Sequence, residues 1–323
     1  MLDLTAFGLA VGHATDPVGV TGCTVVRGVD GPFRCAASLL GRASGTRELA
    51  VGSPDHLVDR ADAILLTGGS AYGLDAAAGV MRWMEERGRG YPVGVGVVPI
   101  VPAAVLFDLG VGDARARPTP DMAYAACDAA SPHLGPEAQG SVGAGTGATV
   151  GKVLGPGRAM KGGVGAAVVG TRAVRAAALA AVNALGDVRD ARGAVLAGAR
   201  GEDGAFADAE RTLAAGLAGE GTPFGNTTLC VVALTVAVDR VALAQLARAA
   251  AAALHRRITP CGTTFDGDVI FAVCPPAPPT AAAPLALEAL AVAALEEAVE
   301  QAVRRARGLP GVPGLADAER AAS

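Results

Sequence analysis

Pro223-Phe224-Gly225-Asn226-Thr227-Thr228-Leu229-Cys230 runs directly into the apolar stretch VVALTVAV (231–238), which predicts a buried strand that begins at Thr227. Cleavage of the 226–227 peptide bond would make Thr227 a new N-terminus, with a hydroxyl and a free amine on one residue. An α-amino group titrates at about 7.7–8.0, so it can act as the base that activates the hydroxyl of the same threonine. The alternative is that Gly225-Asn226 is a turn and Thr227 begins an ordinary strand.

Composition leaves the fold class open but excludes several functions. The chain has 323 residues, 51% hydrophobic and 3% aromatic, so it can form one large domain or two ordinary ones with a core of Ala, Val and Leu. The net charge of −4, without a Lys/Arg cluster, argues against nucleic-acid binding. No window of about 18 residues is apolar and free of Gly, Pro and charge, so we expect no membrane span.

The cysteines and the N-terminal residues favour a cytoplasmic protein without a metal. The 6 cysteines occur singly, with no C-x-x-C pair, which excludes the usual zinc spacings and favours reduced thiols. No H-E-x-x-H motif or acidic cluster predicts a metal site. Residues 1–5 (MLDLT) have no basic region of the kind that begins a signal peptide. We therefore expect no cofactor, no metal and a cytoplasmic location.

Hydrophobic patterns predict strands and helices that alternate along the chain. Strands are expected at 23–26, 63–66, 93–101, 164–169, 194–197, from Thr227 onward, and at 269–273. Helices are expected at 70–87, with Ser70 as the N-cap, at 241–256, and at 285–304 with a Glu296, Glu297 and Glu300 face. This alternation predicts a layered α/β or α+β domain, and the Gly- and Pro-interrupted segment 305–323 is expected to be flexible.

Three motifs of known chemistry fail on their context. GAGTGA (143–148) matches the dinucleotide fingerprint G-x-G-x-x-A, but a polar stretch precedes it instead of a strand. Gly151-Lys152 lacks the upstream Gly and the downstream Ser/Thr of a phosphate loop. GGSAY (68–72) approaches the G-x-S-x-G nucleophile elbow, but Tyr72 replaces the last glycine. Their elimination strengthens the case for Thr227.

Several segments, in order along nearly the whole chain, resemble the P1 peptidase family (the DmpA-type aminopeptidases, peptidase family S58). Each segment is short, and the order of the whole set makes the resemblance specific. The segments are VGHATD (11–16), GCTVV (22–26), LTGGSAYGL (66–74), VPIVP (98–102), GSVGAGTGA (140–148), KGGVG (161–165), GNTT (225–228) and DGDVIF (266–271).

The resemblance implies a fold and a maturation step. Members fold as four-layer αββα sandwiches, which resemble N-terminal-nucleophile hydrolases with a different connectivity. They cut themselves before a Ser or Thr, and the two fragments stay together. In this chain the cut would fall between Asn226 and Thr227, giving an α chain of residues 1–226 and a β chain of residues 227–323 within one domain.

The resemblance also implies an activity and further site residues. Members release N-terminal residues from peptides or amides, some accept D- or β-amino acids, and many form tetramers. One relative hydrolyses a pantetheine amide, and the threonine nucleophile resembles that branch. Asn183 corresponds to the oxyanion-hole asparagine, and Asp266 and Asp268 correspond to a Ser-x-Glu or Ser-x-Asp pair. Ser70 and Tyr72 would line the substrate pocket.

Each of these residues has a purely structural alternative. Asn183 suits a helix C-cap, Asp266-Gly267-Asp268 suits a turn, and Ser70 and Tyr72 suit the start of a helix. On a strand, however, the two aspartates would point to the same face, where a carboxylate can orient the new amine and assist proton transfer.

We predict a self-processing hydrolase that forms an acyl-enzyme on Thr227 and acts on the N-terminal residue of short peptides or on a small amide. The resemblance implies a homo-oligomer, a tetramer in many members. Two alternatives stay open from the sequence. One is an acyltransferase on the same scaffold, which passes the acyl group to an amine. The other is a non-catalytic small-ligand-binding protein that is never cut.

Overall fold

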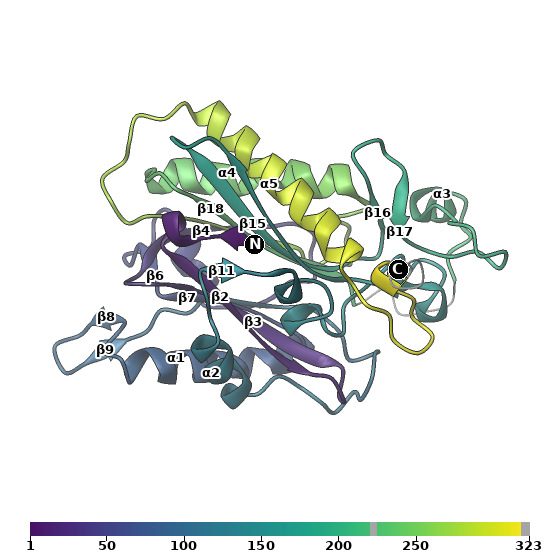
Figure 1. Cartoon of the computed structure of the whole chain (residues 1–323), viewed down its shortest axis with the longest axis horizontal. Coiled ribbons are helices and arrows are strands. Elements are labelled where there is room, and N and C mark those ends of the chain that lie inside the picture. Colours follow the sequence, from purple (N-terminus) through teal and green to yellow (C-terminus); the bar gives the residue numbers. More distant parts are fainter. Residues whose placement is uncertain (220–224, 318–323) are drawn as a thin grey trace.

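The computed structural model describes residues 1–219 and 225–317, which form a four-layer αββα sandwich (Figure 1). Two sheets pack against each other, and two helices cover the outer face of each sheet. Helices α4 (Arg240–Arg257) and α5 (Pro284–Arg304) cover the larger sheet, and α1 (Ala77–Glu85) and α2 (Pro120–Asp128) cover the smaller one. The predicted fold class is confirmed. Pro223 and Phe224 of the octapeptide lie outside the described residues.

The larger sheet places the Thr227 strand in its interior. Its six strands have the order β14-β15-β18-β20-β4-β6. β18 runs antiparallel to β15 and parallel to β20, and all 8 of its residues are buried. Its continuous apolar sequence suits a strand that is covered on both faces. The strands are β14 (Gly163–Gly170), β15 (Arg175–Asn183), β18 (Thr227–Leu234), β20 (Val269–Cys274), β4 (Phe33–Leu39) and β6 (Arg60–Ala61).

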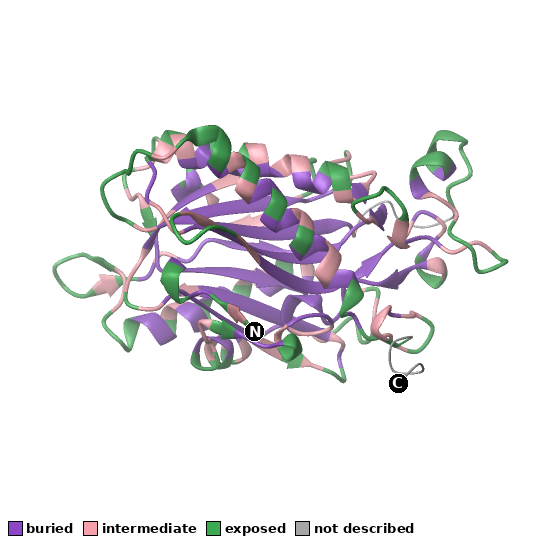
Figure 2. Ribbon diagram, turned by 45° about the horizontal axis from the view of Figure 1, so that its top comes forward, coloured by how far each residue is buried: buried purple, intermediate pink, exposed green. Residues whose placement is uncertain are grey.

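The smaller sheet has five strands in the order β2-β3-β7-β10-β5. β7 and β10 run parallel, and the other neighbours run antiparallel. One apolar core lies between the two sheets, and another lies between the larger sheet and the helices α4 and α5. Figure 2 shows the strands buried, while α4 and α5 bury one face only. The strands are β2 (Leu9–Asp16), β3 (Thr21–Gly28), β7 (Ala63–Thr67), β10 (Ala103–Val105) and β5 (Gly45–Arg47).

Short elements complete the described fold. Three further strand pairs or triplets lie outside the two main sheets, and one short hairpin joins α1 to β10. They are β1 (Leu2–Asp3) with β11 (His133–Leu134), β12 (Thr149–Val150) with β13 (Met160–Lys161), β16 (Asp187–Arg189) with β17 (Val195–Ala197) and β19 (Ile258–Thr259), β8 (Tyr91–Pro92) with β9 (Val97–Val98), and helix α3 (Ala209–Ala214).

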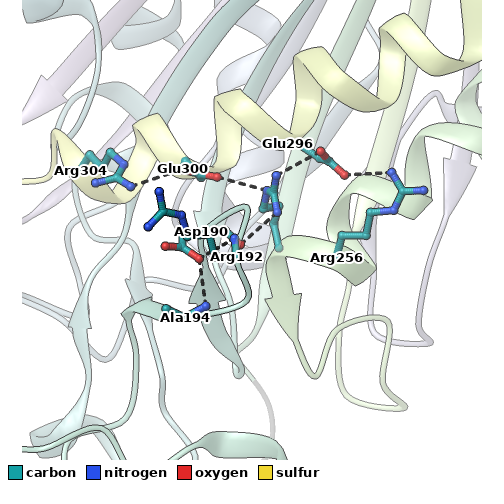
Figure 3. A network of polar contacts seen from close by, with 8 residues as sticks. Asp190, Arg192, Ala194, Arg256, Glu296, Glu300 and Arg304 are labelled. Atoms are coloured by element: carbon teal, nitrogen blue, oxygen red, sulfur yellow. Dashed lines mark hydrogen bonds and ion pairs between the residues drawn. The ribbon is translucent and has the colours of Figure 1, made fainter.

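A polar network joins the C-terminal end of α4 to α5 (Figure 3). Glu296 of α5 accepts from Arg256 and from Arg257 of α4, both at 3.1 Å. Arg257 Nε lies 3.3 Å from Glu300, which also pairs with Arg304 at 3.3 Å. The predicted acidic face of the last helix therefore faces α4 through Glu296 and Glu300.

Most of the predicted elements are confirmed. The strands expected at 23–26, 63–66, 164–169 and 269–273 lie within β3, β7, β14 and β20, and the strand expected at 194–197 contains β17. The helices expected at 241–256 and 285–304 lie within α4 and α5, and the strand at Thr227 begins as predicted. It ends at Leu234, before the end of the apolar stretch.

Two predicted elements are wrong. Residues 93–101 do not form one strand: they belong to the β8–β9 hairpin and the loop after it, where Val95 is 99% exposed and packs on no core. The helix predicted at 70–87 begins as a 3-10 segment, Ser70–Ala76, and becomes α-helical only in α1. The N-cap position is occupied by Gly69, and Ser70 is the first residue of the 3-10 segment, with a left-handed φ of 52°. The Ser70 side chain makes no capping hydrogen bond, so its predicted N-cap role is wrong.

The described part of the C-terminal segment folds back on the body. Ala306 is buried, Leu309 pairs with Val312, and the Ala316 amide donates to the Ala306 carbonyl at 3.1 Å. The flexibility predicted for 305–323 stays a prediction, and residues 318–323 lie outside the described residues. Of the helices in residues 1–219 and 225–317, none combines the length and the apolar sequence needed to cross a bilayer.

Candidate active site

Thr227 is the first residue of β18, and its nitrogen belongs to the 226–227 peptide bond at which the sequence predicts cleavage. The residue is 6% exposed, and its hydroxyl donates to the carbonyl oxygen of Asn226 at 2.5 Å. The backbone amide of Gly267 donates to the same oxygen at 3.0 Å. The carbonyl of the 226–227 bond therefore has two hydrogen-bond donors, one of which is the hydroxyl of the next residue.

The backbone around this bond is closely packed. Asn226 bridges to Asp266 in parallel, which brings the turn before β20 beside Thr227. A Cβ added to Gly267 would lie 2.9 Å from Thr227 Oγ1 and 2.7 Å from the Ala43 carbonyl oxygen. A glycine at 267 thus allows the backbone amide to approach the Asn226 carbonyl.

Asp266 and Asp268 flank this glycine, and both are buried. Asp268 Oδ1 accepts from the Thr228 amide at 2.5 Å, and its Oδ2 accepts from the Gly262 amide at 3.1 Å. Asp266 Oδ2 accepts from the Thr263 amide at 2.7 Å, as in a turn. The two residues precede β20 and do not lie on it, so the predicted strand geometry is wrong. Asp268 nevertheless contacts the backbone amide of Thr228, the residue directly after Thr227.

Asn183 is the last residue of β15, directly opposite Thr227 in the strand register. Its Nδ2 donates to the carbonyl oxygens of Gly225 and Phe107, both at 3.0 Å. Its Oδ1 accepts from the Thr149 amide at 3.0 Å. The structural alternative of a helix C-cap is wrong, because Asn183 ends a strand. The strand register and not the sequence spacing brings it to the site.

Lys152 is the site residue that the sequence analysis missed. Its Nζ donates to the Gly225 carbonyl at 2.8 Å and to both the carbonyl and the side-chain oxygen of Asn183 at 3.0 Å. The Gly-Lys pair attracted attention only as a fragment of a phosphate loop. The signal that remained in the sequence was a lysine in a glycine-rich region, which by itself does not identify a site.

Burial sets the charges of this cluster. The side chain of Lys152 is half-buried, but its Nζ is enclosed by oxygen acceptors, and loss of solvation lowers its pKa to about 7 against the opposing effect of Asp266 and Asp268. Burial raises the pKa of Asp268 to about 7, and the Asp266 carboxylate adds to the rise. Lys152 and Asp268, whose pKa values are both shifted to about 7, thus lie close to Thr227. Shifted pKa values of this kind are typical of functional sites.

A cavity of about 370 Å³ opens beside Thr227. Ser70 lines this cavity, whereas Tyr72 is 60% exposed and is not among the lining residues; their role in substrate binding stays a prediction. Tyr72 instead stacks under the guanidinium of Arg117, 3.6 Å from the ring centroid. The cavity walls come from residues 43–45, Ser70, Ala71, Val105, Phe107, Phe265 and the segment 225–227.

The sequence comparison identifies the family of this chain. The model of peptidase family S58 matches residues 4–316. The chain belongs to peptidase family S58. As a member of this family, it is a hydrolase of peptide or amide bonds.

Curated relatives of this S58 protein include proteins of Mycobacterium and Kocuria. An uncharacterized aminopeptidase of Mycobacterium tuberculosis is 40% identical over 343 residues, covering 96% of this chain and 95% of the relative. A 6-aminohexanoate-oligomer endohydrolase of Kocuria sp. is 33% identical over 271 residues, covering 82% of this chain and 72% of the relative.

Solved structures share the fold of this S58 protein. The L-aminopeptidase D-Ala-esterase/amidase of Ochrobactrum anthropi, described as a variant of the Ntn hydrolase fold, superposes with a TM-score of 0.72 and 20% identity, covering 97% of this chain and 90% of the other. The PH0078 protein of Pyrococcus horikoshii superposes with a TM-score of 0.69 and 19% identity, covering 94% and 86%. At these identities the likeness concerns the fold.

Proposed function

We propose that this chain is a self-processing N-terminal-threonine hydrolase that cuts its own 226–227 bond and then hydrolyses a short peptide or a small amide through an acyl-enzyme on Thr227. The observation that carries the proposal is the carbonyl of Asn226, which accepts from the Thr227 hydroxyl and from the Gly267 amide. A neutral amine or a carboxylate near this hydroxyl can then accept its proton, which activates the oxygen for attack on the carbonyl carbon.

Self-cleavage is a transfer of the Asn226 acyl group from nitrogen to oxygen. Thr227 Oγ1 adds to the carbonyl carbon, and the hydroxyl proton passes to a base. The C–N bond then breaks, and the Thr227 nitrogen takes up a proton to become a free amine. Water hydrolyses the resulting ester and releases the carboxylate of Asn226 and the free hydroxyl of Thr227. The Gly267 amide stabilises the negative oxygen of the first step.

Lys152 is the base that we assign to the first step. Its pKa of about 7 leaves a large neutral fraction at neutral pH, and it contacts Gly225, the residue before Asn226. After cleavage, the amine of Thr227 takes over this role, since an α-amino group titrates at about 7.7–8.0. Asp268 would hold that amine in place, because it already accepts from the next backbone amide.

Cleavage also frees the donors that a substrate needs. In the uncut chain, Asn183 Nδ2 and Lys152 Nζ both donate to the Gly225 carbonyl. When residues 225–226 move away from the site after cleavage, these donors are free to bind the carbonyl oxygen of a substrate. Asn183 would then act as the oxyanion-hole residue, for which one preorganised donor lowers the barrier by about 3–4 kcal/mol.

The two fragments would remain together. The β chain supplies β18 and β20, and β15 and β4 from the α chain flank them on either side in the same sheet. Separation would expose an apolar core on both faces of β18. We also propose a homo-oligomer, with four copies as the expected assembly, and a cytoplasmic location, in keeping with 6 free cysteines.

The intact mass of freshly purified protein and of the Thr227→Ala variant tests the proposal. We expect two fragments divided between Asn226 and Thr227 from the natural chain and one uncut, inactive chain from the variant. A cut Thr227→Ala protein would overturn the mechanism. One full-length mass for both would favour a binding protein that is never cut. An acyl group that passes to hydroxylamine much faster than to water would favour the acyltransferase.

A further inference from the structure

Lys161 is a buried cation that the proposed mechanism does not use. Its side chain is 1% exposed. The basic residues of the chain are arginines at every position except Lys152 and Lys161, and Lys152 contacts Asn183 directly. Burial of a charged side chain is costly unless its hydrogen-bonding groups are satisfied. A buried lysine therefore requires acceptors for its N–H groups.

Three backbone carbonyls surround the Lys161 ammonium. Nζ donates to the carbonyl oxygens of Gly145 at 2.9 Å, Ala148 at 2.8 Å and Gly162 at 3.1 Å. An ammonium has three N–H donors, so each of them can have one acceptor. Loss of solvation lowers the pKa of Lys161 to about 7, against the opposing effect of the buried Asp108 carboxylate. The ammonium ties two segments of the chain together.

A single peptide group connects Lys161 to Asn183. The Ala148 carbonyl, which accepts from Lys161 Nζ, and the Thr149 amide belong to the same peptide bond. The Thr149 amide donates to Asn183 Oδ1 at 3.0 Å, and the Gly162 amide donates to the Ala148 carbonyl at 2.9 Å. Thr149 also lies directly opposite Lys161 in the register of β12 and β13. Sheet pairing therefore holds this peptide group beside the ammonium.

The nitrogen of the Asn183 side chain has two hydrogens, and both are used in the uncut chain. Nδ2 donates to the carbonyl oxygens of Phe107 and Gly225, both at 3.0 Å. Gly225 belongs to the segment that we expect to move away after cleavage, whereas Phe107 stays in place. The freed hydrogen would then point toward the substrate carbonyl. Its direction depends on how firmly Oδ1 and the other hydrogen are held.

A cation bound to one end of a peptide group strengthens the hydrogen bond at its other end. The ammonium draws electron density from the Ala148 carbonyl, which makes the Thr149 N–H a better donor. That bond in turn polarises the Asn183 amide, so Nδ2 becomes a stronger donor to a developing oxyanion. The same contacts hold the amide plane in one orientation before the reaction begins.

We propose that Lys161 is a positioning residue, which acts on substrate hydrolysis through the Ala148–Thr149 peptide group and the Asn183 side chain. This inference rests on the proposed function, in which Asn183 donates to the oxyanion of the substrate. Self-cleavage would not depend on Lys161, because we assign the oxyanion of that step to the Gly267 amide.

Lys161→Met tests this role, because methionine fills a similar volume without a charge or an N–H group. The hydrolysis of alanine p-nitroanilide and of p-nitrophenyl acetate is measured with fully cut protein. We expect kcat to fall by about tenfold and KM to change by less than about threefold, since the substrate cavity is retained. An unchanged kcat would overturn the inference.

Asn183→Ala separates an effect through Asn183 from a general effect on the fold. In Asn183→Ala protein, Lys161→Met should change kcat by less than about twofold, because the group through which Lys161 acts is absent. The activated ester p-nitrophenyl acetate keeps the low rate of these variants measurable. An equal loss in both backgrounds would overturn the inference, because independent effects add.

Met160→Ala is the control for lost packing. Met160 is the neighbour of Lys161 on β13, is buried, and lies opposite Val150. Its truncation should lower the melting temperature and leave kcat within about twofold. A loss of kcat as large as that of Lys161→Met would overturn the inference. Lys161→Gln, which keeps N–H donors but no charge, enters the same comparisons and decides by the same criteria if Lys161→Met does not fold.

The natural chain separates this inference from the proposed function. A natural chain that is never cut, or a cut one that hydrolyses neither probe, contradicts the proposed function, and the inference falls with it. If the natural chain is cut and active, Lys161→Met should also be cut to completion. A folded Lys161→Met chain that remains uncut would place Lys161 in the self-cleavage step and overturn the inference alone.

Discussion

The backbone amide of Gly267 donates a hydrogen bond of 3.0 Å to the carbonyl oxygen of Asn226. The two residues are 41 apart in the sequence, and the parallel bridge between Asn226 and Asp266 brings them together. This amide belongs to the turn before β20, so its position is fixed by the sheet and not by the segment that would be cut. A donor held in this way can stabilise the oxyanion without rearrangement.

Gly267→Ala is expected to slow self-cleavage by at least about a hundredfold, the usual effect of losing one oxyanion donor. The new Cβ would lie 2.7 Å from the Ala43 carbonyl oxygen and 2.9 Å from Thr227 Oγ1, so the turn must move away from the scissile bond. The fraction of cut chain, followed by gel electrophoresis after cell-free synthesis, measures the rate.

Gly157→Ala is the matched control for this substitution. Gly157 is exposed, and a Cβ there meets no atom within 4 Å. This variant should be cut at the natural rate. If Gly267→Ala is cut as quickly as Gly157→Ala, the Gly267 amide does not contribute to the reaction.

Asn183→Asp is expected to lower kcat by about 10²–10³-fold in fully cut protein. The aspartate keeps an oxygen for the Thr149 amide and for Lys152, which both contact Asn183 Oδ1 at 3.0 Å. It loses the Nδ2 donor that we assign to the substrate carbonyl. Steady-state kinetics on alanine p-nitroanilide give the measurement.

Asn183→Ala removes the acceptor as well as the donor. It should lose activity to the same extent and also lower the melting temperature, because the buried Thr149 amide loses its partner. Activity of Asn183→Asp within about tenfold of the natural protein would exclude the oxyanion role.

The sequence located the parts of this site that a local pattern encodes. A polar Gly-Asn-Thr segment before an apolar run predicted both β18 and its first residue, and family resemblance added Asn183, Asp266 and Asp268. Lys152 escaped prediction because its partners, Asn183 and Gly225, are 31 and 73 residues away. A single lysine in a sequence indicates a site only when the fold places it beside other polar groups.

The errors in the fold have a similar origin. Residues 93–101 alternate valine and glycine as an exposed strand would, yet within them β9 covers just Val97–Val98. The sheet strand that follows is β10, three residues long and paired with β7 and β5. Ser70 has the residue type of an N-cap, but Gly69 and Ser70 both take left-handed conformations. Tertiary contacts decided both positions, and residue preference did not.

Self-cleavage is expected to accelerate as pH rises through about 7 and to level off above about pH 8. Lys152 must be neutral to accept the proton of Thr227, and burial lowers its pKa to about 7, so the active fraction increases with pH across this range. Precursor made by cell-free synthesis and shifted to buffers between about pH 5.5 and 9 gives the rate at each pH.

Two variants identify the group that titrates. Lys152→Arg keeps a charge that is not lost in this range, so it should remain uncut at every pH tested. Asp268→Asn removes the other group with a pKa of about 7, and it should slow the reaction while keeping its rise with pH. If the cleavage rate of Asp268→Asn does not change with pH, the group whose titration controls the reaction is Asp268 and not Lys152.

Arg257→Met is expected to lower the free energy of unfolding by about 2–3 kcal/mol, because it leaves two partly buried carboxylates short of a partner. The side chain of Arg257 is 12% exposed and contacts Glu296 and Glu300, which are each 17% exposed. It also donates to the Asp190 carbonyl at 3.1 Å. This network joins α4, α5 and the turn after β16 (Figure 3).

Arg256→Met is the control, because Arg256 contacts the same Glu296 at 3.1 Å but its side chain is 63% exposed. Water already screens this pair, so we expect a loss of less than about 1 kcal/mol. Urea unfolding of both variants in the Thr227→Ala background keeps a single covalent chain and permits two-state treatment. Equal losses for Arg256→Met and Arg257→Met would mean that burial does not strengthen the inner pair. In that case the polar network adds no more to stability than an ordinary surface contact, and the packing of α4 and α5 depends on their apolar faces alone.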